Sequence, residues 1–136
     1  MKAKKLQGYS TLKKKLDRIF SEWVRRRFAD SRGFAICVSC GKASHWKSLH
    51  AGHFVSRVRL ATRWDPENVN PQCPRDNIFL AGNAVGYARW LENRYGPSIF
   101  AALDERSRRP VKFSRSDLQT MIDEFKRKLE ELPCSK

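Results

Sequence analysis

The sequence has no long hydrophobic run. Its apolar runs are only a few residues long, far short of the roughly 20 that a helix needs to cross a bilayer. The basic N-terminus is not followed by the apolar segment of a secretion signal, so we expect neither a signal peptide nor a membrane span. Internal repeats and low-complexity segments are also missing, which argues against a solenoid or a simple disordered tail.

Acidic residues are scarce. The 136 residues include 14 Asp and Glu but 28 Lys and Arg, which gives a formal net charge of +14. A field of this sign most commonly attracts nucleic acid. Membrane binding is not expected, since no basic stretch is backed by a free apolar face. Hydrophobic residues still make up 40% of the chain, including eight Phe and four Trp, which is enough for one compact core.

Cysteines are few, and their spacing is informative. Cys37 and Cys40 form a C-x-x-C pair followed by Gly41, the usual form of a zinc knuckle, whereas a redox pair would open a helix after a strand. Cys73 stands alone, and Cys134 near the C-terminus is most simply a free thiol. Because such cysteines stay reduced inside cells, we expect a cytoplasmic protein.

Amphipathic helices are predicted near both ends of the chain. Apolar residues recur at spacings of three and four from Ser10 to Asp30, with Ser10 or Thr11 as the N-cap. They recur again after Ser114, which forms a capping-box pattern with Asp117. The C-terminal stripe can pack on its own domain or on a second copy, as a homodimer. The opposite face of the first helix carries cations that can follow phosphates or simply be solvated: Lys13, Lys14, Arg18, Arg25 and Arg26.

Residues 33–83 hold most of the Gly, Pro, Cys and His, so short strands and loops are expected there. A helix is predicted over Asn83–Tyr95, ended by Gly96, and a short one over Pro97–Asp104. The predicted organisation is a basic arm and helix over residues 1–32, a core over 33–96 and a helical region over 97–136.

The motifs in the middle of the chain are weak singly and specific in combination. They run in the order Cys37-Val38-Ser39-Cys40, Ala51-Gly52-His53, Asn68, Gln72-Cys73, Asn77 and Gly82-Asn83. This order resembles the HNH, or ββα-metal, nucleases, and looks most like the phage NinG (Rap) recombination endonucleases. The resemblance covers residues 33–96. It implies an α+β fold, with two antiparallel strands and a helix around a catalytic Mg²⁺ or Mn²⁺ and a structural Zn²⁺. The flanking amphipathic helices are predicted from the apolar spacing alone.

The resemblance makes His53 the general base that takes a proton from the attacking water. Histidine suits this work because its ordinary pKa of about 6.5 leaves it largely neutral at cellular pH. The alternative is a buried histidine that holds a loop. Asn68 is expected to orient the loop that holds His53.

The same resemblance implies the ligands of the catalytic cation. Asn77 is expected to bind it, and Asn83 is a further candidate. Many HNH enzymes carry Asp or His directly before the base, where this chain has Gly52; others carry Asp three residues before the base, where it has His50. We therefore take His50 as a ligand, although imidazole suits Mg²⁺ less well than a carboxylate does.

The predicted zinc site departs from the family in its second cysteine pair. Asp76 stands where the fourth Cys is expected, and a carboxylate can complete a tetrahedral zinc site. The expected ligands are thus Cys37, Cys40, Cys73 and Asp76. His45 is an alternative fourth ligand, and replacement of the zinc by hydrophobic packing is a third possibility.

Six arginines near these motifs are predicted to hold DNA phosphates, because a guanidinium can bind phosphate through two nitrogens. They are Arg57, Arg59, Arg63, Arg75, Arg89 and Arg94. Three tryptophans, Trp46, Trp64 and Trp90, could stack on splayed bases, although indoles more often belong to the core.

Two functions are compatible with these patterns. The first, implied by the resemblance, is a metal-dependent endodeoxyribonuclease that cuts branched DNA such as Holliday junctions and D-loops in phage recombination, leaving 5′-phosphate and 3′-hydroxyl ends. It would act in the cytoplasm of the bacterial host. The alternative is a zinc-knuckle DNA-binding protein without catalysis, favoured by the missing side chain at Gly52 and the missing fourth cysteine. A base poised near Asn77 favours the nuclease.

Overall fold

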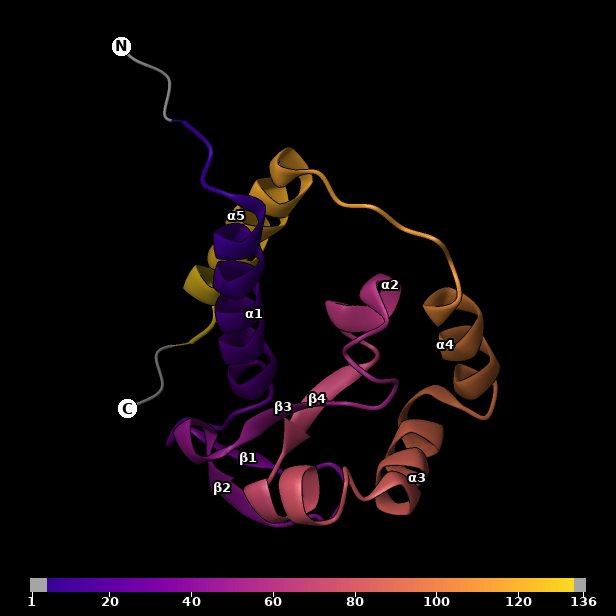
Figure 1. Ribbon diagram of the computed structural model, residues 1–136. Coiled ribbons are helices and arrows are strands. Elements are labelled where there is room, and N and C mark those ends of the chain that lie inside the picture. The colour runs from indigo at the N-terminus through magenta and orange to yellow at the C-terminus, as the bar shows by residue number, and fades with distance from the viewer. Residues whose placement is uncertain (1–4, 134–136) are drawn as a thin grey trace.

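The computed structural model describes residues 5–133 (Figure 1), so Cys134 and the predicted arm residues Lys2 and Lys4 lie outside the described part. The elements in chain order are α1 (Tyr9–Arg26), β1 (Phe34–Ile36), β2 (Ala43–His45), the 3-10 turn η1 (Trp46–Ser48), β3 (His50–His53), α2 (Leu60–Arg63), β4 (Val69–Gln72), the π-helical turn η2 (Arg75–Phe79), α3 (Ala84–Tyr95), α4 (Ile99–Ser107) and α5 (Arg115–Glu131).

Two small antiparallel sheets form the centre of the molecule. β1 pairs with β2, and β3 pairs with β4 in a register that runs from His50 opposite Gln72 to His53 opposite Val69. The amide of Val38 donates to the carbonyl of Pro71 at 3.0 Å, which ties the segment after β1 to β4. The predicted α+β class is therefore confirmed.

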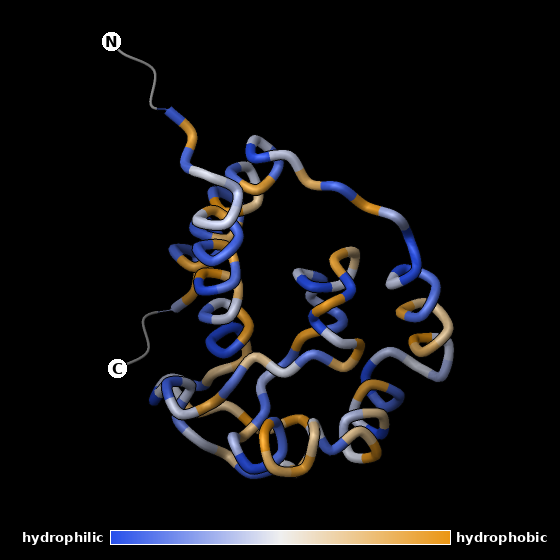
Figure 2. The backbone as a smooth tube through the Cα atoms, viewed as in Figure 1, coloured by the Kyte–Doolittle hydropathy of each residue, from blue (hydrophilic) through white to orange (hydrophobic). Residues whose placement is uncertain are grey.

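Helices from the two ends of the chain share the main core. α1 and α5 lie side by side in Figure 1, and α1 also contacts β3 and β4. Both helices alternate between hydrophilic and hydrophobic segments in Figure 2, as the 3.6-residue period requires. The apolar stripe of α5 is thus used within the chain. The buried residues of this core are Leu12, Leu16, Ile19, Phe20, Val24, Trp64, Val69, Leu118, Ile122 and Phe125.

A second core lies between α3 and α4. Tyr87 and Leu91 of α3 pack with Ile99 and Leu103 of α4. Arg106 at the end of α4 binds Asp65 at 3.0 Å and Glu67 at 2.7 Å, which fastens α4 to the loop before β4. Within residues 5–133, no helix is both long and apolar enough to cross a membrane.

The periodic helices occur as predicted, but some ends differ. The N-cap of α1 is Gly8 in an extended conformation, so the prediction of Ser10 or Thr11 as the cap was wrong. The helix ends at Arg26 instead of Asp30, because the guanidinium of the next residue, Arg27, turns to the carbonyls of Pro66 and Val69. At α5, the predicted capping box between Ser114 and Asp117 is confirmed.

Candidate functional site

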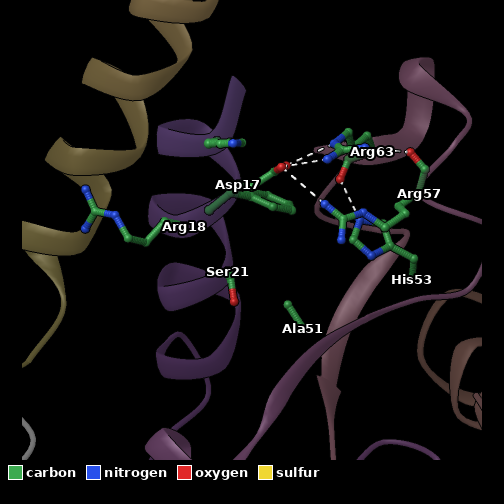
Figure 3. A pocket seen from close by; sticks show the side chains of 9 residues that line it. Asp17, Arg18, Ser21, Ala51, His53, Arg57 and Arg63 are labelled. Carbon is green, nitrogen blue, oxygen red and sulfur yellow. Dashed lines mark hydrogen bonds and ion pairs between the residues drawn. The ribbon is translucent and has the colours of Figure 1, made fainter. Parts of the chain in front are cut away.

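The candidate residues occupy the two faces of β3. Side chains alternate along a strand, and the pairing of β3 with β4 is continuous, so Ala51 and His53 lie on one face and His50 and Gly52 on the other. The first face looks toward α1, as Figure 3 shows for Ala51 and His53. The second face looks toward the side chain of Gln72, which approaches Gly52.

The imidazole of His53 lies in a pocket of about 380 Å³ between α1, β3 and α2 (Figure 3). Its Nε2 lies 2.8 Å from the carbonyl oxygen of Arg63. A carbonyl only accepts hydrogen bonds, so Nε2 carries the proton and the lone pair of a neutral ring is on Nδ1. Burial lowers the pKa of His53, and the charges of Arg57 and Arg63 lower it further. The ring is therefore neutral at pH 7 and able to accept a proton.

Asp17 of α1 organises the pocket, and the sequence analysis did not identify it. Its carboxylate accepts from Arg63 Nη2 at 2.6 Å and Nε at 2.9 Å, a bidentate pair, and from Trp64 Nε1 at 2.9 Å. Arg57 Nη2 donates to the same carboxylate at 3.2 Å. Since the carbonyl of Arg63 also holds His53, α1 fixes the segment that orients this histidine.

Asp17→Asn is expected to destabilise the fold by about 2 kcal/mol at pH 7, since Arg63, whose side chain is only 11% exposed, loses its ionic partner. Burial raises the pKa of Asp17, but the hydrogen bonds and charges of Arg63, Trp64 and Arg57 lower it overall. A lowered carboxyl pKa adds stability above the unfolded-state pKa and loses it as pH falls through the folded-state value. The difference between variant and wild type should thus shrink in acid.

Urea unfolding at pH 7 and at about pH 2.5 measures this difference. The control is Asp104→Asn, which breaks only an exposed pair with Arg108 on α4 and should cost less than about 0.5 kcal/mol. Equal losses in the two variants at pH 7 would show that Asp17 is merely a surface charge.

His50 and Asn77 meet on the other face of β3. Asn77 Nδ2 lies 3.0 Å from His50 Nδ1, and both side chains are half-buried. A Cβ at Gly52 would lie 1.9 Å from Gln72 Oε1, so the position directly before His53 has no room for a ligand side chain. His50, two residues earlier, lies on the same face of β3 as Gly52.

His50 and Asn77 together offer two donor atoms to a divalent cation. The 3.0 Å contact joins His50 Nδ1 to the amide nitrogen of Asn77, so the amide must turn over for its oxygen to face a cation. With Oδ1 in that place, the two donors would lie about 3 Å apart, the separation of two ligands at right angles around an ion with bonds of about 2.1 Å. The donors are an imidazole nitrogen and an amide oxygen without a carboxylate, a set that suits Mn²⁺ better than Mg²⁺. The pair fits such an ion with water and phosphate as the remaining ligands.

Asn68 and Tyr87 hold the chain on either side of His53. Buried Asn68 accepts from the amide of Val55 at 2.8 Å and donates to the carbonyls of Val55 and Thr62, which closes the loop after β3. The buried hydroxyl of Tyr87 donates to the carbonyl of Gly52 at 2.7 Å. The backbone before and after His53 is thus fixed by side chains from β4 and α3.

Asn83 lies elsewhere than predicted. Its Oδ1 accepts from the amide of Gly86 as the N-cap of α3, while its Nδ2 donates to Asp76 at 3.0 Å and to the carbonyl of Ser39. These contacts use both N–H groups of the amide and one of the two lone pairs of its oxygen. Asn83 therefore supports Asp76 and is not brought to the side chain of His50, which corrects its prediction as a ligand of the catalytic cation.

The four predicted zinc ligands form one cluster. The ligand atoms of Cys37, Cys40, Cys73 and Asp76 all lie within 4.8 Å of one another. Cys40 Sγ is 3.9 Å from Cys73 Sγ, and Cys37 Sγ is 3.8 Å from Asp76 Oδ2. Zinc with four sulfur ligands at about 2.3 Å places them about 3.8 Å apart. The cluster therefore fits a tetrahedral zinc ion.

Hydrogen bonds prepare Asp76 and Cys37 to bind a cation. Ser39 Oγ donates to Asp76 Oδ2 at 2.6 Å, and the bonds from Asn83 and Ser39 lower the pKa of the buried Asp76 carboxyl to about 2. Burial raises the pKa of Cys37, but hydrogen bonds, among them those from the backbone amides of Cys73, Cys40 and Ser39, outweigh it and lower the pKa. Both groups are biased toward the charged forms that metals require.

His45 is not the fourth ligand of this cluster in the described part of the chain. It lies on β2 opposite Phe34, at the far end of the β1–β2 register from the knuckle. Its Nδ1 accepts from the amide of Lys47 at 3.2 Å, and its ring packs on Phe34 and Trp46. The carboxylate of Asp76 takes the place that His45 was considered for.

The predicted phosphate-binding arginines differ in their ion pairs and in the exposure of their side chains. The guanidinium of Arg63 forms a bidentate pair with Asp17, so Arg63 supports the pocket and does not offer a free guanidinium to phosphate. Arg57, at the pocket rim, keeps 59% of its side chain exposed. Arg75 is 68% exposed beside Asp76. The remaining three are also exposed and lie before α2 or on α3: Arg59, Arg89 and Arg94.

Helix α1 adds cations to the same pocket, but the three predicted base-stacking tryptophans pack against other groups. Lys14 and Arg18 line the pocket, although the guanidinium of Arg18 points away from His53 in Figure 3. Trp64 is buried in the main core. Trp46 is half-buried with the Arg25 guanidinium 5.2 Å from its ring centre. Trp90 is half-buried against the second core.

A protein-family model described as Bacteriophage Lambda NinG protein matches residues 1–134. The chain belongs to the NinG family. NinG is a phage family connected with recombination, so membership assigns the chain a role in phage recombination and interaction with DNA. The match includes α1 and α5 as well as residues 33–96, so the flanking helices, Asp17 included, are part of the NinG domain. No curated protein and no solved structure matches the chain.

Proposed function

We propose that the chain is a metal-dependent endodeoxyribonuclease of the HNH type that cuts branched DNA in phage recombination. The observation that carries the proposal is the state of His53, a neutral imidazole held through Nε2 by the Arg63 carbonyl with Nδ1 free in a basic pocket. Burial alone would lower the pKa of any histidine, so the geometry supports the proposal: a histidine that only held a loop would need no cations such as Lys14 and Arg57 around its pocket. We expect this action in the cytoplasm of the bacterial host.

The residues of the chain divide the work of hydrolysis between them. His53 Nδ1 takes a proton from a water molecule, and Arg57 and Lys14 attract the phosphate at the pocket rim. His53 and the His50–Asn77 pair lie on opposite faces of β3, so a phosphodiester would have to pass the edge of β3 that does not pair with β4 to reach both. His50 and Asn77 would hold the cation, which when bound neutralises charge on the phosphate and the leaving 3′ oxygen.

The zinc cluster has a structural part in this proposal. It joins the loop after β1 to the end of β4, directly before η2, which carries Asn77. Zinc bound there would fix the position of Asn77 relative to β3.

The alternative function is DNA binding without catalysis. It is favoured by the lack of a carboxylate in the His50 and Asn77 pair, which departs from the ligands that Mg²⁺ prefers. Cleavage of a labelled four-way junction and of linear duplex, with no metal, Mg²⁺ or Mn²⁺, separates the two functions. The nuclease cuts the junction with a cation, fastest with Mn²⁺, whereas binding without cleavage in all conditions supports the alternative.

DNA binding should weaken steeply with salt. In a plot of the logarithm of the binding constant against the logarithm of the salt concentration, each neutralised phosphate contributes about −0.9 to the slope. Lys14→Gln, in the His53 pocket, is expected to reduce the slope by about 1. Lys112→Gln, on the connection between α4 and α5, is the control and should leave the slope unchanged. Fluorescence anisotropy titrations between low and moderate salt measure both. A flat dependence in the wild type would mean that the charge of +14 does not serve DNA binding.

A further inference from the structure

The turn that follows Asn77 exposes three consecutive large apolar side chains. Ile78 is 58% exposed, Phe79 79% and Leu80 49%. Figure 2 colours the turn between β4 and α3 as hydrophobic, away from the helical cores. Single exposed apolar residues are common, but a contiguous group of this size usually marks a contact surface. None of the three belongs to the buried clusters of the described residues.

The backbone holds this turn in place. The amide of Gly82 donates to the carbonyl of Asp76 at 2.7 Å, and Gln72 Nε2 donates to the carbonyl of Gly82 at 2.7 Å. The turn then reverses through Ala81 and Asn83, whose φ angles of 48° and 43° are costly for residues with a Cβ. The apolar side chains cannot turn inward without breaking these bonds, so their exposure is built into the fold.

Cations flank the apolar tip. Arg75 begins the same turn with its side chain 68% exposed, and Lys42 lies beside it on the pocket next to Cys40. Asp76 is the acidic residue of the turn, and it is buried and directed at the cysteine cluster. A second copy of the chain would bring like charges together at this surface. DNA instead offers phosphates for the cations and bases for the apolar tip.

We propose that Phe79, supported by Ile78 and Leu80, is a wedge that inserts between bases of the DNA substrate. The inference rests on the proposed function, because the wedge begins one residue after Asn77 and would act beside the cut phosphate. Inserted apolar side chains unstack a base step, which costs least where bases are already unpaired or at a branch. Phe79 is thus the residue that selects branched or unpaired DNA over regular duplex.

The test is a four-way junction that carries 2-aminopurine at its centre, since this base becomes fluorescent when it is unstacked. Binding is measured without divalent cations, so that no cleavage occurs. The wild type should raise the fluorescence several-fold. Phe79→Ala should lose most of that rise and bind the junction about 10-fold more weakly, while its affinity for linear duplex changes less than twofold.

Ile78→Ala and Ile36→Ala form a matched pair, because the two isoleucines are 58% and 57% exposed and Ile36 lies on β1. The first should reduce the fluorescence response and the second should not. All three positions are exposed, so the variants should keep the wild-type melting temperature.

The wedge is overturned if the wild type gives no fluorescence response, or if Phe79→Ala responds like the wild type. It is also overturned if the one property that Phe79→Ala loses is self-association in ultracentrifugation, or binding to phosphatidylserine vesicles. The nuclease proposal fails separately. A wild type that opens the junction but never cuts it with Mg²⁺ or Mn²⁺ keeps the wedge and removes the nuclease. A wild type that cuts without unstacking does the reverse.

Discussion

The His53→Ala variant is expected to cleave a labelled junction 10²- to 10⁴-fold more slowly than the wild type and to bind it with unchanged affinity. Removing the imidazole removes the proton acceptor of the pocket, while the phosphate-attracting side chains of Arg57 and Lys14 remain. Because burial and the neighbouring cations lower the pKa of His53, the wild-type rate should be flat above pH 7 and fall in acid, as the ring becomes protonated.

Single-turnover cleavage measured over a range of pH checks this expectation. His45→Ala is the control, because His45 lies on the β1–β2 hairpin and packs on Phe34 and Trp46, away from the His53 pocket. It should leave the rate and its pH dependence unchanged. A His53→Ala rate within threefold of the wild type would remove His53 from the mechanism.

The second large effect is expected at Asp76. Asp76→Ala should lose zinc and fold stability together, because it removes one of four ligands and leaves Ser39 and Asn83 without their acceptor. The loss should be on the order of 3 kcal/mol, which lowers the melting temperature by roughly 10 °C. Asp76→Cys should instead retain zinc more tightly, since thiolate is a stronger zinc ligand than carboxylate in such sites.

Elemental analysis of protein purified without added metal, together with thermal unfolding, measures these effects. Asp104→Ala, at an exposed carboxylate of α4, is the control and should resemble the wild type. Acid should release zinc from the wild type, because carboxylate and thiolate bind only when deprotonated. A full zinc content in Asp76→Ala that resists chelators equally well would exclude Asp76. A wild type that folds normally without zinc would show that the cluster is only an inherited pattern.

The helices could be predicted where their cause is local. The spacing of Leu118, Ile122 and Phe125 and the Ser114 capping box define α5 without reference to the rest of the chain. The end of α1 could not be placed in this way. It depends on Arg27, whose guanidinium binds carbonyls about 40 residues further along the chain.

The same distinction between local patterns and contacts with distant residues applies to the candidate site. The family resemblance implied that Asp76 joins the three cysteines and that His50 and Asn77 share a cation. In the structure the first four side chains form one cluster, and His50 and Asn77 contact each other. Asn83 was misassigned, because its role depends on a left-handed backbone and on Asp76 as a partner. Asp17 was missed, because an acidic residue on the polar side of a helix carries no local signal and its partner Arg63 is 46 residues away.

The central claim is that this chain hydrolyses DNA phosphodiesters with water activated at His53. The most direct test is cleavage of a synthetic junction in H₂¹⁸O with Mn²⁺, followed by mass spectrometry of the product ends. The account predicts one ¹⁸O atom in a 5′-phosphate and an unlabelled 3′-hydroxyl, formed by the wild type and by His45→Ala but not by His53→Ala. No cleavage by the wild type, or products equally abundant with His53→Ala, would contradict it.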